Sequence, residues 1–259
     1  KNVKMFQVGD KVFSRIDETL IGTMAEYVVS NEIDTALMPK NLSYSEAASI
    51  PLAGLTAYQS LIEVAKLSSK ENILIHAGAG GVGTIAIQLA KHLGAMVTAT
   101  TSTKNIELVR SLGADKVIDY TKENYLDGPS KFDVVYDTLG GKFTLDSFKI
   151  LGSGGRVISI AGDLDSITAK QLGLNKIISF MLALKARKIT KKASKMNALY
   201  RFLLMVPSGS QLKELATFYE SGSIKPVIDK TYGFDSSIQA LEYLSKGRAK
   251  GKVIVNLID

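Results

Sequence analysis

The stretch Gly78-Ala79-Gly80-Gly81-Val82-Gly83 decides the fold of this 259-residue chain. Its glycines have the G-x-G-x-x-G spacing, an apolar run over 73–77 precedes it, and a helical pattern over 83–93 follows. In such a turn the first glycine permits the tight bend, the second lets a pyrophosphate approach the backbone, and the third lets the helix pack on the strand. The start of the helix adds unpaired N–H groups and the positive end of a dipole. This context predicts a dinucleotide site rather than a glycine turn without a ligand.

Around this turn, short β-branched runs alternate with amphipathic helical patterns, which predicts a parallel sheet covered by helices. The runs expected as strands are 73–77, 96–100, 116–119, 133–136, 156–160 and 201–205. The expected helix over 83–93 presents an apolar stripe and ends before Gly94. The fold class is therefore predicted as α/β, with a Rossmann-type doubly wound parallel sheet.

The first fifty residues have a different pattern, with short alternating stretches at 11–13 and 25–29 that are typical of small antiparallel strands. A helix is expected from Ser45 to Ala65 with Ser45 as its N-cap. After Pro226, a β-run, a helix over 236–245 and a strand over 252–257 are expected to return to the N-terminal part. This predicts a β-rich remainder at 1–50, a nucleotide-binding domain at 51–225 and a return segment at 226–259. Because the β-rich part has few strands and begins at Lys1-Asn2-Val3, we expect further sequence ahead of it.

The composition excludes several kinds of site. The chain has no cysteine, so these residues form no disulfide, no thiolate nucleophile and no cysteine-ligated zinc site. His76 and His92 lie on an expected buried strand and on the next helix, which favours structural roles over metal binding. The longest apolar run, 177–184, is far shorter than the ~20 residues of a membrane span. We therefore expect a cytoplasmic protein without a metal site.

The net charge of +7 is concentrated in one segment. From Ser166 to Lys213 there are ten basic residues and no acid, so the rest of the chain carries a net charge of −3. Such a segment either attracts nucleic acid or anionic lipid or forms solvated helix faces, and the second is the commoner case. Its apolar residues indicate a helix that caps a cleft or packs on another subunit.

The end of the second expected strand distinguishes between two cofactors. An NAD site usually places Asp or Glu about 20 residues after the glycine turn, where it binds the ribose 2′-hydroxyl. This chain has Thr101, Ser102 and Lys104 there, and the next acid, Glu107, lies within the following helix. Hydroxyl donors and an ammonium suit a 2′-phosphate, so NADPH is the predicted cofactor. The alternative is a polar strand end with no phosphate role.

Further motifs carry a family resemblance. They are Gly9-Asp10-x-Val12, Ala25-Glu26-Tyr27, Ala47-Ala48-x-x-Pro51-Leu52-Ala53-Gly54-Leu55-Thr56-Ala57-Tyr58, Ser111-Leu112-Gly113-Ala114-Asp115, Phe132-Asp133-Val134-Val135-Tyr136-Asp137 and Gly247-Arg248-Ala249-Lys250-Gly251-Lys252. Together with the glycine turn they resemble the zinc-independent medium-chain dehydrogenases/reductases of the quinone oxidoreductase branch, in particular its alkenal/quinone reductase-like and reticulon-interacting-like members. The resemblance covers essentially the whole chain. It implies a β-rich, GroES-like catalytic domain, incomplete here at its N-terminus, and a homodimer.

The resemblance also implies which residues hold the cofactor. Thr56 would reach the nicotinamide ribose, Ser102 with Lys104 or Asn105 would bind the 2′-phosphate, and Tyr120 would cover the adenosine phosphate. The pyrophosphate would lie on Ala79, Gly80, Gly81 and Val82. The nicotinamide would be lined by Leu139, Ala161, Gly162, Phe202, Leu203 and Leu204. Related sequences have lysine where this chain has Asn105, and Tyr120 and Phe202 have an alternative role as packing aromatics.

The predicted function is the transfer of hydride from NADPH to a quinone or to the activated C=C of an α,β-unsaturated carbonyl, without zinc. Conjugation in such acceptors takes up the charge, so the protein needs only to orient nicotinamide and acceptor. Simple alcohols and ketones lack this property and call for an electrophilic metal or for a Ser/Tyr/Lys constellation of the short-chain type, and the sequence shows neither. The alternative is a non-catalytic nucleotide-binding protein whose basic segment, 166–213, contacts RNA, a membrane or a protein partner. The sequence assigns no catalytic acid.

Overall fold

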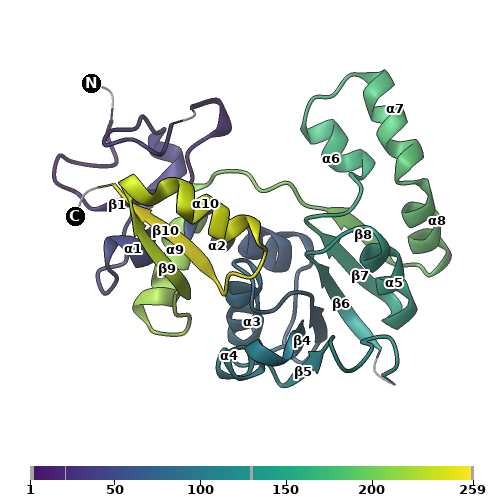
Figure 1. Cartoon of the computed structure of the whole chain (residues 1–259). Coiled ribbons are helices and arrows are strands. Elements are labelled where there is room, and N and C mark those ends of the chain that lie inside the picture. Colours follow the sequence, from purple (N-terminus) through teal and green to yellow (C-terminus); the bar gives the residue numbers. More distant parts are fainter. Residues whose placement is uncertain (1–2, 21, 129–130, 258–259) are drawn as a thin grey trace. The chain divides into compact units, whose positions relative to one another are not determined.

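The computed structural model describes residues 3–20, 22–128 and 131–257 (Figure 1). Its chain forms two compact units. The first comprises Lys1–Tyr58, Gly80–Ile85 and Met205–Asp259, and the second comprises Gln59–Ala79 and Ala86–Leu204. Lys1 and Asn2, with which the expected β-rich part begins, lie outside the described residues.

The second unit is built on a parallel sheet of six strands. In chain order these are β3 (Asn72–Ile75), β4 (Met96–Thr101), β5 (Lys116–Asp119), β6 (Phe132–Asp137), β7 (Leu151–Ser159) and β8 (Leu199–Phe202). Their spatial order is β5-β4-β3-β6-β7-β8, so the chain runs from the centre to one edge, returns, and runs to the other edge. This is the order of a Rossmann sheet, and it confirms the predicted α/β fold class.

Helices cover both faces of this sheet. The helices of the unit are α3 (Gly83–His92), α4 (Ile106–Ser111), α5 (Lys142–Ile150), α6 (Ser166–Gln171), α7 (Lys176–Lys185) and α8 (Arg187–Lys195), with the short elements η3 (Gln59–Val64) and η4 (Thr103–Asn105), and among them α7 is the one that does not pack on the sheet. On one face, Leu74 and Val135 pack in a cluster with Phe148 of α5 and Ile189 of α8. On the opposite face, Ala99 of β4 lies beside side chains of α3 and α4. The sheet is thus buried on both sides, as a doubly wound parallel sheet requires.

The pattern of strands and helices in this unit agrees closely with the sequence. Strands are found at all six predicted places, and the predicted helix over 83–93 is α3, after which Gly94 adopts a φ of +81°. Two boundaries differ. β7 begins at Leu151, five residues early, because its pairing with β6 shifts register between Phe132 and Val134. β8 ends at Phe202 because, after the Leu203 N–H donates to Ser159 O, the chain leaves the sheet.

The described part of the first unit contains two small sheets and four complete α-helices. β1 (Val12–Ser14) pairs antiparallel with β2 (Thr35–Leu37), and β9 (Ile228–Gly233) pairs parallel with β10 (Lys252–Asn256) through η5 (Phe234–Ser236) and α10 (Ser237–Ser245). The other helices are α1 (Tyr44–Ala48), α2 (Pro51–Tyr58) and α9 (Gly209–Glu220), with short turns η1 (Glu18–Leu20) and η2 (Glu32–Asp34). The strands and the helix predicted after Pro226 are therefore confirmed.

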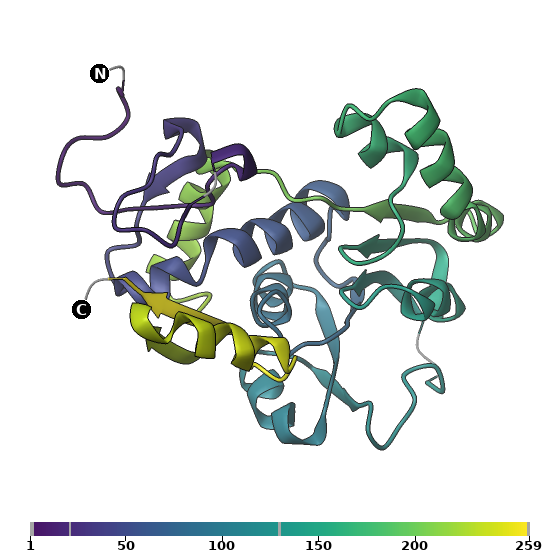
Figure 2. The same ribbon diagram turned by 45° about the horizontal axis from the view of Figure 1, so that its top comes forward.

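Contacts tie the late residues of the first unit to its early ones. A Cβ at Gly209 would lie 2.3 Å from the Thr35 carbonyl oxygen, so α9 starts directly against β2 (Figure 2). Asn41 Nδ2 donates to the Tyr219 carbonyl at 3.0 Å, and Ser45 Oγ donates to Asn256 Oδ1 at 2.9 Å. Residues separated by about the length of the second unit therefore fold together.

Two expectations for the first unit are wrong. The stretch 25–29 is not a strand: it has no ladder partner among the described residues, and Tyr27 and Val29 are largely exposed. The helix expected over 45–65 is divided into α1, α2 and η3. Its N-cap is Ser43, which forms a capping box with Glu46. Pro51 has no N–H to donate and disfavours helical geometry at the residue before it, so α1 ends and α2 begins at the proline.

The burial of His76, directly after β3, should make the stability of the protein depend on pH. Its ring is fully buried, and this burial lowers its pKa to about 4, against the opposing effect of Asp137. The unfolded chain binds the proton near pH 6.5, so the free energy of unfolding decreases as the pH falls from about 6.5 to about 4, by up to ~3 kcal/mol. Urea unfolding at several pH values measures this decrease. It should be largely absent in His76→Asn and retained in His92→Gln, and a stability that is flat across this window would contradict the assignment.

Candidate functional site

The carboxyl ends of the six parallel strands gather most of the predicted cofactor residues at one edge of the second unit. The residues there are Ala79, Ser102, Lys104, Asn105, Tyr120, Leu139, Ala161, Gly162, Phe202, Leu203 and Leu204. β3 and β6 are neighbours in the centre of the sheet, and the chain leaves them toward opposite edges. In open parallel sheets this switch point is where ligands bind, outside the carboxyl ends of the strands.

The glycine turn follows β3 directly. The Gly78 N–H donates to the Thr100 carbonyl at 2.8 Å, and a Cβ at Gly78 would lie 3.0 Å from both Ala99 Cβ and Ile87 Cδ1. The close packing of turn, β4 and α3 thus favours glycine at Gly78, because a side chain there would force Ala99 or Ile87 to shift, whereas the sequence argument gave the packing role to the third glycine. α3 begins at Gly83, so its unpaired N–H groups lie at the end of the turn.

Lys252 is a cation beside this turn that sequence reasoning missed. Within the first unit, a Cβ at Gly81 would lie 2.9 Å from Lys252 Cδ and 3.2 Å from the Gly251 carbonyl oxygen. Lys252 is half-buried, its burial lowers the pKa of its ammonium, and no carboxylate of the described chain pairs with it. A partly desolvated ammonium beside the N–H groups of a helix start fits a phosphate. Since Lys252 lies far along the chain from the turn, no local pattern reports this proximity.

The remaining predicted residues of the first unit are Thr56, Val82 and Gly80, and Gly80 forms an isolated parallel β-bridge with Gly251. Thr56 lies in α2, where its side chain is buried and its hydroxyl donates to the Leu52 carbonyl at 2.7 Å. Val82 is half-buried in the glycine turn. The first unit also has an open cleft of about 680 Å³, lined by β1, α1, the start of α2 and β10, that includes none of the predicted cofactor residues.

The loop after β4 carries the residues predicted for the 2′-phosphate. Ser102 precedes η4, and Asn105 Nδ2 donates to its Oγ at 3.4 Å. Asn105 Oδ1 is buried without a partner in the described chain, and Lys104 is exposed. Buried amide groups are nearly always hydrogen-bonded, so the unpaired Oδ1 of Asn105 fits a ligand group that donates a hydrogen bond.

A carboxylate also lies at this loop, which the argument from an acid-free strand end did not consider. Asp119, the last residue of β5, accepts hydrogen bonds from the hydroxyls of Thr103, at 2.5 Å, and Thr121, at 2.7 Å. The Thr103 bond, followed by those from Thr121, keeps the pKa of this carboxyl below its usual value. Asp119 therefore fixes η4 on β5, and its charge is shared among hydroxyl donors beside the predicted phosphate residues.

Asp137, the last residue of β6, holds the loop predicted to line the nicotinamide. Its side chain is fully buried. Oδ1 accepts the N–H groups of Leu139 and Gly140 at 3.0 and 2.9 Å, and Oδ2 accepts the hydroxyls of Thr144 and Ser159. Four donors compensate for the burial of this charge, and they fix the loop after β6.

Ser159 extends this network to the loop after β7. Its Oγ also accepts the N–H groups of Gly162 at 2.8 Å and Ala161 at 3.3 Å. A Cβ at Gly162 would lie 2.6 Å from the Tyr200 hydroxyl, and one at Gly140 would lie 2.1 Å from the Ala161 carbonyl oxygen. The two loops therefore touch, and neither glycine has room for a side chain.

The exposed predicted residues differ from the buried ones in what they offer a ligand. Tyr120, Leu139 and Leu204 are 60%, 44% and 45% exposed, so their side chains are available at the strand ends. Phe202 and Leu203 are half-buried. The exposure of Tyr120 does not support its alternative role as a packing aromatic.

His76 lies deep in the same edge. Its ring packs edge-on against Tyr125 at 4.8 Å and against Phe143 at 5.5 Å, and Nδ1 lies 3.2 Å from Thr100 Oγ1. His92 is exposed at the end of α3. Among residues 3–20, 22–128 and 131–257, no group of three His, Asp or Glu is placed to hold a metal ion.

Comparisons with known proteins agree with one another. A model of the family described as "Zinc-binding dehydrogenase" matches residues 112–255. The "2-methylene-furan-3-one reductase" of Solanum lycopersicum is 41% identical over 267 residues, covering 99% of this chain and 60% of that protein. The "NADPH-dependent alkenal/one oxidoreductase, chloroplastic" of Arabidopsis thaliana is 36% identical over 263 residues, covering 98% and 59%. The chain thus spans about three-fifths of the length of these relatives.

A solved structure supports the same relationship. The "quinone oxidoreductase from Coxiella burnetii" superposes with a TM-score of 0.83 at 28% identity, covering 99% of this chain and 75% of that one. The residues matched in this superposition come from both units, so the similarity includes the β-rich part as well as the Rossmann sheet.

Substitution of Asp137 by Asn tests the network at the ends of β6 and β7. The amide presents an N–H₂ group to partners that themselves donate, so buried donors lose their acceptor, and we expect a loss of at least ~2 kcal/mol in the free energy of unfolding. Urea unfolding measures it. The matched control is Asp163→Asn, whose carboxylate forms a half-exposed ion pair with Lys185 and whose loss should change stability by less than ~1 kcal/mol. Equal stabilities of the two variants would refute the role of Asp137.

Proposed function

The chain belongs to the zinc-binding dehydrogenase family, among the quinone oxidoreductase-like medium-chain dehydrogenases/reductases, and we propose that it acts as an NADPH-dependent reductase of quinones or of the activated C=C of α,β-unsaturated carbonyls. The observation that carries this proposal is the glycine turn at the switch point of the Rossmann sheet, beside two loops held by Asp137. The names of the relatives, a reductase and oxidoreductases, agree with it. The non-catalytic alternative is not favoured.

Residues of the chain supply three kinds of group for the proposed cofactor. The backbone of Gly80 and Gly81, with the Lys252 ammonium, would bind the pyrophosphate, because N–H groups and a cation attract the same anion. Ser102 and Lys104 would bind the 2′-phosphate through a hydroxyl and a charge. Thr56 would meet the nicotinamide ribose. The roles of Ser102, Lys104 and Lys252 are supported by residue type and by the surroundings described above, whereas the role of Thr56, whose buried hydroxyl donates to the Leu52 carbonyl, rests on the family relationship.

The proposed reaction needs rigidity more than acid–base catalysis. When bound, the reduced nicotinamide supplies a hydride. The loops after β6 and β7 would offer it a fixed surface, because Asp137 and Ser159 hold their backbones in one arrangement. A conjugated acceptor delocalises the incoming charge onto its oxygen, where a backbone N–H or water can meet it. Orientation of two bound molecules is then the main task of the protein.

We further propose that the reaction needs no zinc and that the enzyme is a cytoplasmic homodimer. The first point is supported by the donor set, since the chain has no cysteine and the ring of His76 is enclosed by aromatic side chains. The homodimer is supported by β8, which lies at the edge of the six-stranded sheet, where a further strand can pair.

Cofactor titrations can separate the proposed phosphate contacts. NADPH should bind more tightly than NADH, and Ser102→Ala and Lys104→Ala should weaken NADPH alone, since NADH lacks the 2′-phosphate. Lys252→Met should weaken both about tenfold, because the pyrophosphate is common to them. The fluorescence of the reduced cofactors measures each affinity, with exposed Lys246→Met as the control. Equal affinities of the parent chain for the two cofactors would overturn the NADPH assignment.

The reaction is tested on the protein with its complete natural sequence. We expect NADPH oxidation with small ortho- or para-quinones or short alkenals, and none with simple alcohols, because only conjugated acceptors take up the charge without an electrophile. Absorbance at the NADPH band follows the turnover. Exhaustive chelation should leave the rate unchanged. A preparation that oxidises alcohols but reduces no quinone or enone would contradict the proposal. So would a stoichiometric bound metal whose removal abolishes turnover.

A further inference from the structure

Three helices between β7 and β8, α6 to α8, form a projecting part of the second unit (Figures 1 and 2). α6 starts at the N-cap Asp165, and α8 lies against the sheet through Ile189 and Ala193. α7 is different, because none of its residues is buried. Its ten residues contact mainly α6 and α8. We call this segment, residues 166–195, the helical projection.

An unpartnered apolar stripe runs along α7. Ile177, Phe180, Met181 and Leu184 have the spacing i, i+3, i+4 and i+7, which places them on one face of the helix. Their side chains are 74%, 70%, 64% and 56% exposed. Contiguous apolar side chains of this size rarely face water in a protein with no partner for them. The stripe therefore indicates a surface that is covered by an apolar partner.

Basic residues surround the stripe. The helical projection has eight Lys and Arg and no Asp or Glu. Lys188, Lys191 and Lys195 of α8 are exposed and pair with no carboxylate of the described chain. Lys192 instead donates to the Leu145 carbonyl at 2.9 Å and so attaches α8 to α5.

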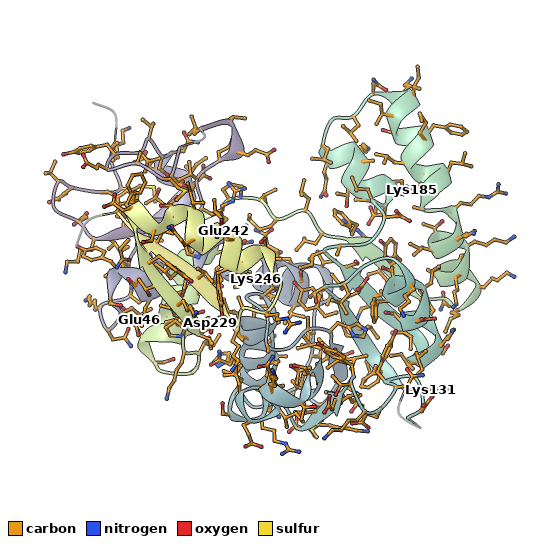
Figure 3. The ribbon with its side chains drawn as sticks, in the orientation of Figure 1. Glu46, Lys131, Lys185, Asp229, Glu242 and Lys246 are labelled. Atoms are coloured by element: carbon orange, nitrogen blue, oxygen red, sulfur yellow. The ribbon has the colours of Figure 1, made fainter. Side chains whose placement is uncertain are left out.

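The lysines of α7 lie beside its stripe. At 3.6 residues per turn, Lys176 and Lys185 fall about a quarter of a turn to either side of it. Figure 3 shows Lys185 at the end of α7, where its Nζ is 3.0 Å from an oxygen of Asp163, a residue just outside the projection. Lysines that flank an apolar face can keep their ammonium groups in a polar layer while their stems lie along the apolar one.

These features distinguish between three occupants. A second copy would bring the same eight positive charges and no acid against the first, and like charges oppose such a contact. Nucleic acid would match the charges but leave the exposed stripe of α7 uncovered. An anionic lipid surface matches both, with acyl chains for the stripe and headgroups for the lysines.

We propose that the helical projection binds the surface of an anionic lipid bilayer, with the stripe of α7 at the boundary of the acyl chains and α8 over the headgroups. No helix in the described part of the chain is long and apolar enough to cross a bilayer, and this binding requires none. Each basic residue near such a surface strengthens binding about fivefold, so the attachment should be reversible and sensitive to salt. The proposal does not depend on the proposed enzymatic function, because it concerns a separate surface.

The absence of tryptophan from the chain allows a direct test. Phe180→Trp places a single tryptophan in the stripe, and Phe234→Trp, in the first unit, places one at another exposed phenylalanine. With vesicles of phosphatidylcholine and phosphatidylglycerol, the tryptophan emission of the Phe180→Trp variant should shift to shorter wavelength and be quenched by brominated lipid. The emission of the Phe234→Trp variant should do neither. Vesicles of phosphatidylcholine alone should leave both unchanged at moderate ionic strength.

Vesicle sedimentation then separates charge from apolar contact. The triple variant Lys188→Glu, Lys191→Glu and Lys195→Glu should weaken binding to anionic vesicles more than 100-fold, whereas Lys116→Glu, Lys131→Glu and Lys246→Glu, with the same change in net charge, should weaken it much less. Met181→Ser with Leu184→Ser should weaken binding about tenfold or more. The matched control is Ile238→Ser with Leu241→Ser, two exposed apolar residues of α10, which should have little effect.

Several outcomes would overturn the proposal. One is equal binding by all variants, or no shift in the tryptophan emission of the Phe180→Trp variant. Another is binding that depends on the lysines but not on Met181 and Leu184, with RNA competing equally well, which would indicate a polyanion site. A third is a dimer in sedimentation velocity that dissociates in the Met181→Ser and Leu184→Ser variant while vesicle binding is unchanged, which would indicate a second copy.

Discussion

The buried carboxylate of Asp137 imposes the constraint on which the carboxyl edge of the sheet depends. A charge without solvent is unfavourable unless donors surround it, and here two backbone N–H groups and two hydroxyls do so. The donors come from the loop after β6, from α5 and from the end of β7. Satisfying one charge thus brings three pieces of chain to fixed positions. Gly140 and Gly162 have no room for a Cβ because these pieces meet so closely.

The same device recurs at two other places along this edge. Asp119 ties the turn after β4 to β5 through Thr103. Asp165 accepts the N–H groups of Thr168 and Phe202 and pairs with Arg201, so it connects the start of α6 to the end of β8. In each case a carboxylate at the end of one segment takes donors from another. These loops have no regular secondary structure, but the carboxylates fix their conformation as firmly as that of the strands they follow.

The sequence predicted most of what depends on local pattern. Strands of the sheet are buried on both faces, and in the sequence they are short β-branched runs. The glycine turn has a recognisable spacing. The bounds of β3, β4, β5 and α3 were therefore expected to within one or two residues. The capping box at Ser43 and the break at Pro51 were also visible in the sequence, but the longer apolar pattern over 45–65 obscured them. The stretch 25–29 has the alternation of a strand, and only the absence of a ladder partner among the described residues shows that it is not one.

What the sequence could not predict is proximity between distant residues. Nothing near Gly81 indicates that Lys252 lies against it, and nothing near Asp137 indicates that Ser159 completes its set of donors. These contacts are set by the order of strands in the sheet and by the return of the last residues to the first unit. The types of the predicted cofactor residues could be read from motifs, whereas the groups that hold them in place required the fold.

The contrast between α7 and the rest of its unit follows from how each is held. α8 is attached by Ile189, Ala193 and the Lys192 hydrogen bond, and α6 by Asp165, so both ends of the helical projection are fixed to the sheet. The N-cap Asn175 of α7 accepts a hydrogen bond from the Ile178 N–H, but the helix has no buried residue. A ten-residue helix is marginal in water on its own, and helices in proteins gain most of their stability from packing an apolar face. α7 therefore has more stability to gain from an apolar partner than any helix already packed on the sheet, and its firmly attached neighbours keep its stripe presented to one.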